Sequence, residues 1–98
     1  MKSSRQDILS SLQRLKREVE KEYHVRTIGV FGSVARDEQT GESDIDLLVE
    51  FSKPVGFVTF MRLEHFLSEQ LGAPVDLVTS DSLKPVIRQD VLAEVIYV

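Results

Sequence analysis

The segment GSVARDEQTGESDIDLLVEF, residues 32–51, holds the strongest structural signals of the sequence. It opens on a Gly-Ser pair that directly follows one apolar run, RTIGVF at residues 26–31, and it closes on a second apolar run. Two aspartates, Asp44 and Asp46, interrupt the second run at alternate positions. Aspartate is disfavoured inside a strand, so the needs of a β-sheet do not account for Asp46.

Apolar periodicity around this stretch predicts alternating helices and strands. Residues 4–23 repeat apolar side chains at steps of three and four, as an amphipathic helix does, and Ser4 with Asp7 forms a capping-box pattern. The further elements expected are strands at 26–31, 43–51 and 75–79, a short helix after Gly32, helices at 57–71 and from Ser80 or Asp81 onward, and a final VIYV that is either a helix tail or a short strand.

This order predicts an α/β fold, a small mixed β-sheet flanked by helices, in a single domain over residues 1–98. Strand 75–79 is expected beside strand 43–51. The side chains expected in the core include Phe31, Phe57, Phe60, Phe66, Leu83, Val86, Ile87, Val91 and Leu92.

Composition excludes several classes of protein. Hydrophobic residues make up 42% of the 98 residues and charged residues 29%, which is a globular balance. Cysteine is absent, so disulfides and thiolate metal sites are excluded. No apolar stretch approaches the roughly 20 residues of a membrane span, and the N-terminus lacks a signal-peptide pattern, so we expect a cytoplasmic protein. The net charge of −4 disfavours direct nucleic-acid binding but does not exclude a nucleotide held by cations.

The aspartates predict a cation site. Side chains alternate faces along a strand, so Asp44 and Asp46 share a face. If strand 75–79 pairs beside them, Asp76 joins the same group. Three carboxylates on adjacent strands supply only oxygen ligands, which suits Mg²⁺ or Mn²⁺ and does not suit zinc. Asp44 alone also fits a turn or capping residue, because it borders a loop.

The Gly32-Ser33 pair predicts the complementary part of such a site. Glycine lets the backbone approach a ligand closely, and a helix N-terminus offers free N–H groups and a positive dipole end. Ser33 adds a hydroxyl. We therefore expect a triphosphate here, facing the carboxylates.

The segments FGSVAR, GESDIDLLVEF and VDLVT together resemble the polymerase-beta-type nucleotidyltransferase superfamily. Within it, the chain is most similar to the minimal nucleotidyltransferases, the MNT proteins of prokaryotes. The family pattern is Gly-Ser-x-Ala-Arg-Gly, then Ser-Asp-x-Asp-Leu, then a later strand aspartate. The positions that match it are Gly32, Ser33, Ala35, Arg36, Ser43, Asp44, Asp46, Leu47 and Asp76. One position departs from it, since Asp37 stands where the family has glycine.

The resemblance implies a Mg²⁺-dependent nucleotidyltransferase with ATP as substrate. Asp44 and Asp46 would bind both ions of a two-metal site, and Asp76 would complete the site of one ion. Gly32, Ser33 and Ser43 would contact the nucleotide. Arg36 would either neutralise phosphate charge or lie on the surface as a solvated arginine.

The resemblance also implies a partner and a role. MNT proteins occur with HEPN-domain RNase toxins, and they act as antitoxins by transferring AMP from ATP onto a tyrosine of the toxin. Two alternatives remain open at this point. One is a small-molecule nucleotidyltransferase of the aminoglycoside type, and the other is an antitoxin that neutralises by binding alone. The sequence leaves the oligomeric state open, a homo-oligomer included.

Overall fold

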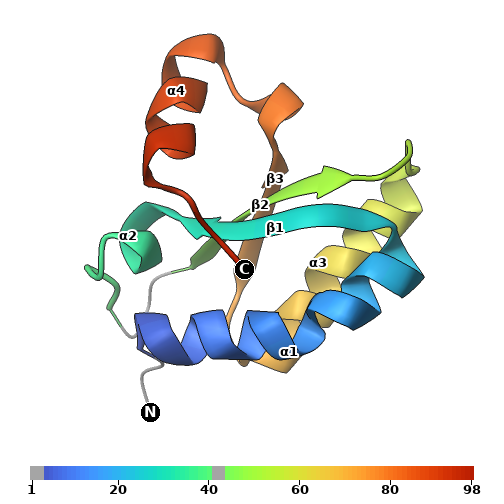
Figure 1. Cartoon of the computed structure of the whole chain (residues 1–98), viewed down its shortest axis with the longest axis horizontal. Helices are drawn as coiled ribbons and strands as arrows, with labels where there is room; N and C mark the ends of the chain where they lie inside the picture. Colours follow the sequence, from blue (N-terminus) through green and yellow to red (C-terminus); the bar gives the residue numbers. More distant parts are fainter. Residues whose placement is uncertain (1–3, 41–43) are drawn as a thin grey trace.

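The computed structural model describes residues 4–40 and 44–98, which form a four-stranded sheet with helices on both of its faces (Figure 1). The elements in chain order are α1 (Arg5–Tyr23), β1 (Val25–Phe31), α2 (Gly32–Ala35), β2 (Ile45–Phe51), α3 (Phe57–Leu71), β3 (Val75–Thr79), the 3-10 turn η1 (Ser80–Ser82), α4 (Pro85–Glu94) and β4 (Ile96–Tyr97). None of the helices in these described parts is long and apolar enough to cross a membrane.

The sheet is mixed, as the sequence predicts. Its strand order is β3-β2-β1-β4. β1 is antiparallel to both β2 and β4, and β2 is parallel to β3. The expected pairing of residues 75–79 beside the Asp-x-Asp strand is therefore confirmed. The final VIYV contributes β4, a two-residue strand at the free edge of β1, and does not continue the last helix.

One face of the sheet packs against α1 and α3 (Figure 1). The capping box that begins α1 is present, because Ser4 Oγ accepts the Asp7 N–H at 3.1 Å and the Asp7 carboxylate accepts the Ser4 N–H at 3.2 Å. The two helices and the sheet together enclose the main core. Its most buried side chains are Leu12, Val19, Ile28, Val30, Val34, Leu47, Val49, Leu63 and Leu67.

The last helix differs from the prediction. Ser80 and Asp81 belong to η1, and α4 begins only at Pro85. A residue before proline is pushed out of the helical region, and Lys84 is extended accordingly, with φ −62° and ψ 144°. Proline at the first helical position is favourable, so Lys84-Pro85 sets the start of the helix.

The expected core residues of α4 and the start of α3 are also corrected. Val91 is buried, but Val86 is 77% exposed, and Ile87 and Leu92 are nearly half exposed. Phe57, in the first turn of α3, is 76% exposed. The α4 residues are exposed because α4 leaves the α1–α3 layer and lies beyond the opposite face of the sheet, where few groups cover it (Figure 1). Phe57 is exposed because it stands at the first position of α3, next to the loop.

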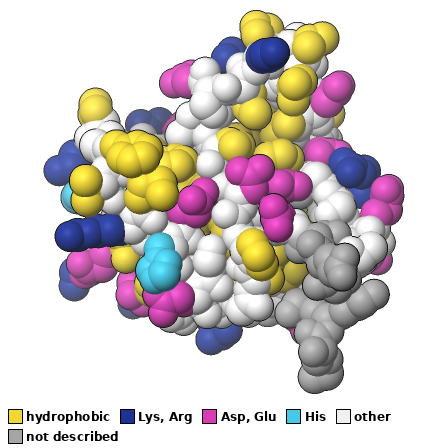
Figure 2. Space-filling view, turned by 180° about the vertical axis from the view of Figure 1, so that it is seen from behind, with side chains coloured by type: hydrophobic (Ala, Val, Ile, Leu, Met, Phe, Trp, Pro, Cys, Tyr) yellow, Lys and Arg dark blue, Asp and Glu magenta, His cyan; other side chains and the backbone are white. Residues whose placement is uncertain are grey.

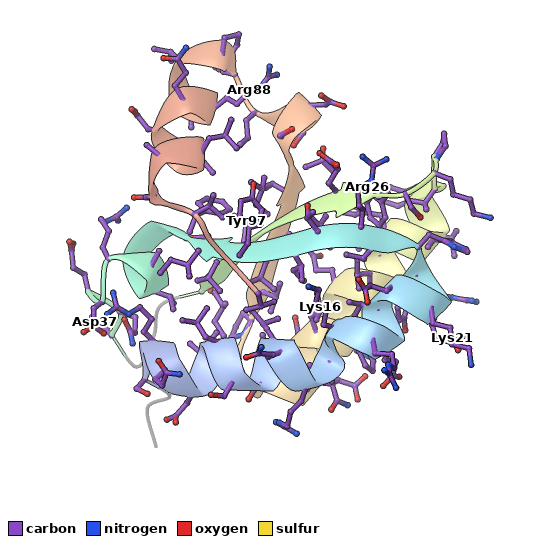
Figure 3. The ribbon with its side chains drawn as sticks, in the orientation of Figure 1. Lys16, Lys21, Arg26, Asp37, Arg88 and Tyr97 are labelled. Atoms are coloured by element: carbon purple, nitrogen blue, oxygen red, sulfur yellow. The ribbon has the colours of Figure 1, made fainter. Side chains whose placement is uncertain are left out.

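Two features hold the C-terminal segment in this place. The side chain of Arg88, a residue of α4, reaches toward η1 (Figure 3). It donates from Nε to the Ser80 carbonyl at 2.9 Å and from Nη2 to the Leu83 carbonyl at 3.2 Å. Its guanidinium therefore ties α4 to η1 and to the segment between them. Gly29 makes room for the chain after α4, because a Cβ there would lie 2.7 Å from Val95 Cγ2.

Candidate functional site

The turn between β1 and α2 packs directly against the Asp-x-Asp strand. Gly32 has φ +71°, a conformation that L side chains rarely adopt. A Cβ at Gly32 would lie 3.0 Å from Asp46 Cγ, 3.2 Å from Asp46 Cβ and closer still to Oδ2. The backbone therefore approaches the carboxylate as closely as it does because residue 32 has no side chain.

Asp46 and Asp76 face each other across adjacent strands. They are register partners in the parallel β2–β3 pair, and partners at a strand spacing of about 4.8 Å project from the same face of the sheet. Asp46 is half-buried and Asp76 is exposed. Asp44 is exposed and lies one residue before β2.

Side chains of α3 hold the edge strand that carries Asp76. The N–H of Leu77 donates to Glu64 Oε2 at 3.2 Å, and the N–H of Val75 donates to Ser68 Oγ at 3.1 Å. These bonds flank Asp76 on both sides and cover an edge that would otherwise present unpaired N–H groups. The backbone beneath Asp76 is thus fixed from two directions, by β2 and by α3.

The charges of Asp44 and Asp76 act on the Asp46 carboxylate. Burial raises the pKa of Asp46 above its ordinary value of 3.8, the charges of Asp76 and then Asp44 raise that pKa further, and the guanidinium of Arg36 opposes them. Like charges at this spacing disfavour simultaneous ionisation unless a cation lies among them. Figure 2 shows acidic side chains gathered near the middle of one face of the molecule, below the apolar side chains of the upper end.

The donor set fits a hard divalent cation, but it is not preassembled. Carboxylate oxygens are the ligands that Mg²⁺ and Mn²⁺ prefer. Among the described residues, however, no three His, Cys, Asp or Glu side chains lie close enough together to hold a metal ion.

Sequence reasoning missed Glu94, the last residue of α4. Its Oε1 accepts the Gly32 N–H at 2.9 Å, and its two carboxylate oxygens accept Arg36 Nη1 at 3.2 and 3.0 Å. The residue pairs are separated by 62 and 58 positions in the sequence. The available signal was weak, a single acidic residue inside the apolar segment VLAEVIYV.

Arg36 lies within the site and is held by acidic neighbours. Glu94 hydrogen-bonds it and raises its pKa, with a smaller contribution from Glu38, whose Oε1 lies 3.5 Å from Arg36 Nε. The next residue, Asp37, has φ +60° and donates its N–H to the Val34 carbonyl at 3.0 Å. Aspartate tolerates this left-handed conformation better than most residues, so the turn forms although glycine is absent.

The structure brings together most of the residues that the sequence singles out. Gly32, Asp46 and Asp76 adjoin one another, and Asp44 and Arg36 act electrostatically on Asp46. Ser33 is half-buried in the second position of α2. The remaining predicted nucleotide contact, Ser43, lies outside the described residues.

The expectation of a helix dipole at this turn is not supported. α2 has four residues, too few for a substantial macrodipole, and the N–H of its first residue, Gly32, is occupied by Glu94.

A hollow of about 820 Å³ lies at the other end of β2 and β3, lined by Phe51, Lys53, Phe57, Ser80 and neighbouring residues. The candidate aspartates do not line it. The interacting carboxylates, and not this hollow, define the candidate site, because titratable groups that perturb one another are typical of functional sites.

Comparison with known proteins shows the family of the chain. Residues 12–98 match the family described as the nucleotidyltransferase domain. The chain is 44% identical to the protein adenylyltransferase MntA of Thermococcus cleftensis over 93 residues, which is 95% of this chain and 94% of that protein.

Two solved structures resemble it as well. One, described as a minimal nucleotidyltransferase, is 37% identical with a TM-score of 0.70 and covers 94% of this chain and 86% of that one. The other, a toxin–antitoxin crystal structure with AMP-PNP, is 26% identical with a TM-score of 0.73 and covers 90% of this chain and 69% of that one. The Gly-Ser turn, the paired strand aspartates and these matches together show that the chain belongs to the nucleotidyltransferase domain family.

Proposed function

We propose that the chain is a Mg²⁺-dependent protein adenylyltransferase that transfers AMP from ATP to a tyrosine of a HEPN-domain toxin and thereby acts as its antitoxin. The observation that carries the proposal is the opposition of Asp46 and Asp76 on adjacent strands, with the Gly32 turn packed on Asp46. A binding module needs no such arrangement, because converging carboxylates repel one another in the absence of a cation.

Each site residue has a role in this proposal. Asp44, Asp46 and Asp76 would hold two Mg²⁺ ions. The bound ions would supply charge neutralisation for the triphosphate and polarise the attacking and leaving oxygens. The hydroxyls of Ser33 and Ser43 would hydrogen-bond the phosphates.

Arg36 would offer a charge-assisted contact to the triphosphate. This guanidinium is engaged by Glu94 and is about half exposed, so part of it is accessible to a ligand.

The proposed reaction is a substitution at the α-phosphorus of ATP. The phenolic oxygen of the acceptor tyrosine forms a bond to the α-phosphorus, and the bond from that phosphorus to the departing pyrophosphate breaks. The phenolic proton is released, and a phosphodiester of AMP remains on the tyrosine. The protein contributes position and charge in such a transfer, and forms no covalent bond itself.

The relatives support this choice of donor and acceptor. The 44% identical relative is a protein adenylyltransferase, which favours a protein acceptor over an aminoglycoside. The 26% identical structure is a toxin–antitoxin pair crystallised with AMP-PNP, an ATP analogue. The exposed apolar side chains of α4, Val86, Ile87 and Leu92, are available for contact with a second protein.

The test uses ATP labelled at the α-phosphate. The chain and its co-encoded neighbour are incubated with this ATP and Mg²⁺ and are separated on a denaturing gel. We expect label on the neighbour that is lost with EDTA, lost in Asp44→Ala/Asp46→Ala and retained in the matched acidic control Glu50→Gln, an exposed residue of the same strand that pairs with Arg26.

A second candidate function, neutralisation by binding alone, is favoured by one observation. The described side chains contain no preassembled metal group. If the double aspartate variant still binds and neutralises the neighbour as well as the wild type does, and no protein is labelled, this second function replaces the first.

A further inference from the structure

Glu94 contacts both ends of the turn that carries Ser33. The turn begins at Gly32, whose N–H donates to Glu94 Oε1, and it ends at Arg36, whose guanidinium donates to both Glu94 oxygens. The turn is closed internally by the Arg36 N–H, which donates to the Gly32 carbonyl at 3.1 Å. One carboxylate from the C-terminal helix therefore clamps the first and last residues of a five-residue segment.

The clamp lies next to the catalytic candidates. Gly32 is the residue whose backbone touches Asp46, and Arg36 is close enough to Asp46 to act on its charge. Displacing the Gly32 backbone would therefore either crowd the Asp46 carboxylate or leave space beside it. A shift of the Arg36 guanidinium would change the charge around Asp46, because Arg36 lowers the pKa of that carboxyl and Glu94 raises it.

The Glu94 contact is partly shielded from solvent. Its side chain is 27% exposed, whereas Glu38, the second acidic neighbour of Arg36, is 61% exposed and lies farther away. Shielded, charge-assisted hydrogen bonds are stronger than exposed ion pairs. From the other side, Arg5 Nη1 donates to the Ala35 carbonyl at 3.1 Å. The turn is therefore hydrogen-bonded to both α1 and α4.

We propose that Glu94 is a positioning residue of the nucleotidyl-transfer site, which holds the Gly32 turn against Asp46 and aims the Arg36 guanidinium toward the triphosphate. This inference rests on the proposed function. It makes the C-terminal segment, which contributes none of the aspartates, part of the site. Glu94 acts through Gly32 and Arg36 and touches neither the nucleotide nor the acceptor in this proposal.

Three variants of the full chain separate this role from a general stabilising one. Glu94→Ala removes both contacts. Glu94→Gln keeps an oxygen that accepts the Gly32 N–H but removes the negative charge that holds Arg36. Glu38→Gln is the matched control, because it removes the other acidic neighbour of Arg36 and leaves the turn untouched.

The kinetic readout is kcat and KM for ATP in labelling of the partner protein. We expect Glu94→Ala to lower kcat/KM by on the order of 10- to 100-fold, as small misplacements of reacting groups do. Glu94→Gln keeps kcat within about twofold and raises KM for ATP several-fold, because Arg36 is no longer aimed. Glu38→Gln changes neither constant by more than about twofold.

A second readout needs no activity. The backbone amide resonance of Gly32 and the side-chain carboxyl resonance of Asp46 are recorded by NMR in the metal-free protein. We expect the Gly32 amide to lose its carboxylate hydrogen bond and exchange faster in Glu94→Ala, with a shift of the Asp46 carboxyl, while Glu94→Gln protects the amide.

The outcomes distinguish failure of the inference from failure of the proposed function. A Gly32 amide or an Asp46 carboxyl that does not change in Glu94→Ala overturns the positioning role, whatever the enzyme does. Changed resonances with unchanged kcat/KM overturn it as well. If the wild type labels no protein, the proposed function fails, and the NMR comparison still decides whether Glu94 positions Asp46. If Glu94→Ala does not fold, Glu94→Gln tests the inference instead. A raised KM for ATP with nearly unchanged kcat supports the positioning role, and an unchanged KM overturns it.

Discussion

Replacement of Gly32 by alanine tests the idea that backbone approach to Asp46 makes the site. The new Cβ would lie inside 3.0 Å of the Asp46 carboxylate, a separation that real Cβ atoms essentially never show. The atom in its way is the end of a side chain, so the collision is relieved when that carboxylate rotates away. We therefore expect the Gly32→Ala variant to keep its fold and to lose the position of the Asp46 carboxylate.

The magnitudes follow from two separate terms. An alanine at φ +71° costs about 1 to 2 kcal/mol of backbone strain, and an off-rotamer aspartate adds about 0.5 to 1.5 kcal/mol. We therefore expect Gly32→Ala to lower the free energy of unfolding by about 1.5 to 3.5 kcal/mol. A carboxylate displaced by on the order of 1 Å lowers kcat/KM by about 100-fold.

Gly72→Ala is the matched control. Gly72 ends α3 with φ +69°, nearly the same as Gly32, but a Cβ there would meet nothing within 4 Å. The control variant carries the strain without the collision. We expect it to lose about 1 to 2 kcal/mol and to keep wild-type kcat/KM. The assays are urea unfolding followed by circular dichroism and initial rates of label transfer to the partner.

Equal kcat/KM in Gly32→Ala and Gly72→Ala would refute the reasoning. It would mean that the Asp46 carboxylate can leave its place beside Gly32 without consequence for the chemistry. A lower kcat/KM in Gly32→Ala alone, with a stability loss that exceeds that of Gly72→Ala by about 0.5 to 1.5 kcal/mol, would support it.

Three further predictions follow. Asp46→Asn should raise the Tm of the metal-free protein at neutral pH. The folded-state pKa of Asp46 is raised from 3.8, so the protonated carboxyl stabilises the folded wild type below that value, and this stabilisation is lost as pH rises through the raised pKa. The Tm difference between variant and wild type in EDTA should therefore widen as pH rises above about 4. Mg²⁺ should then stabilise the wild type and not the variant, and equal metal stabilisation of both would contradict the assigned ligand. Asp37→Gly should stabilise the protein by up to about 1 kcal/mol in urea unfolding, because glycine adopts φ +60° without strain, and a loss of stability would show that the Asp37 side chain contributes more than its backbone costs. Val86→Ser/Ile87→Ser should leave Tm nearly unchanged, since both side chains are exposed, and should weaken the complex with the partner in calorimetric titration; undiminished affinity would exclude this face of α4 from the interface.

Much of the secondary structure of this protein could be predicted from its sequence, because it depends on local chemistry. The bounds of α3 and β3 match the prediction because Gly72 supplies a left-handed helix end and Pro74 prevents continuation. The sharing of a face by the strand aspartates follows from the two-residue repeat of a strand. These signals depend on neighbours a few positions apart, and such neighbours are visible in a linear sequence.

Long-range packing decided the rest. Periodicity shows that α4 has an apolar side but not whether another layer covers it, so Val86 and Ile87 were wrongly expected in the core. No local pattern shows that Glu94 meets Gly32 across 62 positions, since that contact depends on where α4 leaves the sheet. The sequence by itself determined the kinds of residues at the site and the strands that carry them. Only the tertiary structure decided how the C-terminal helix returns to the Gly32 turn, because that return depends on packing between segments far apart in the chain.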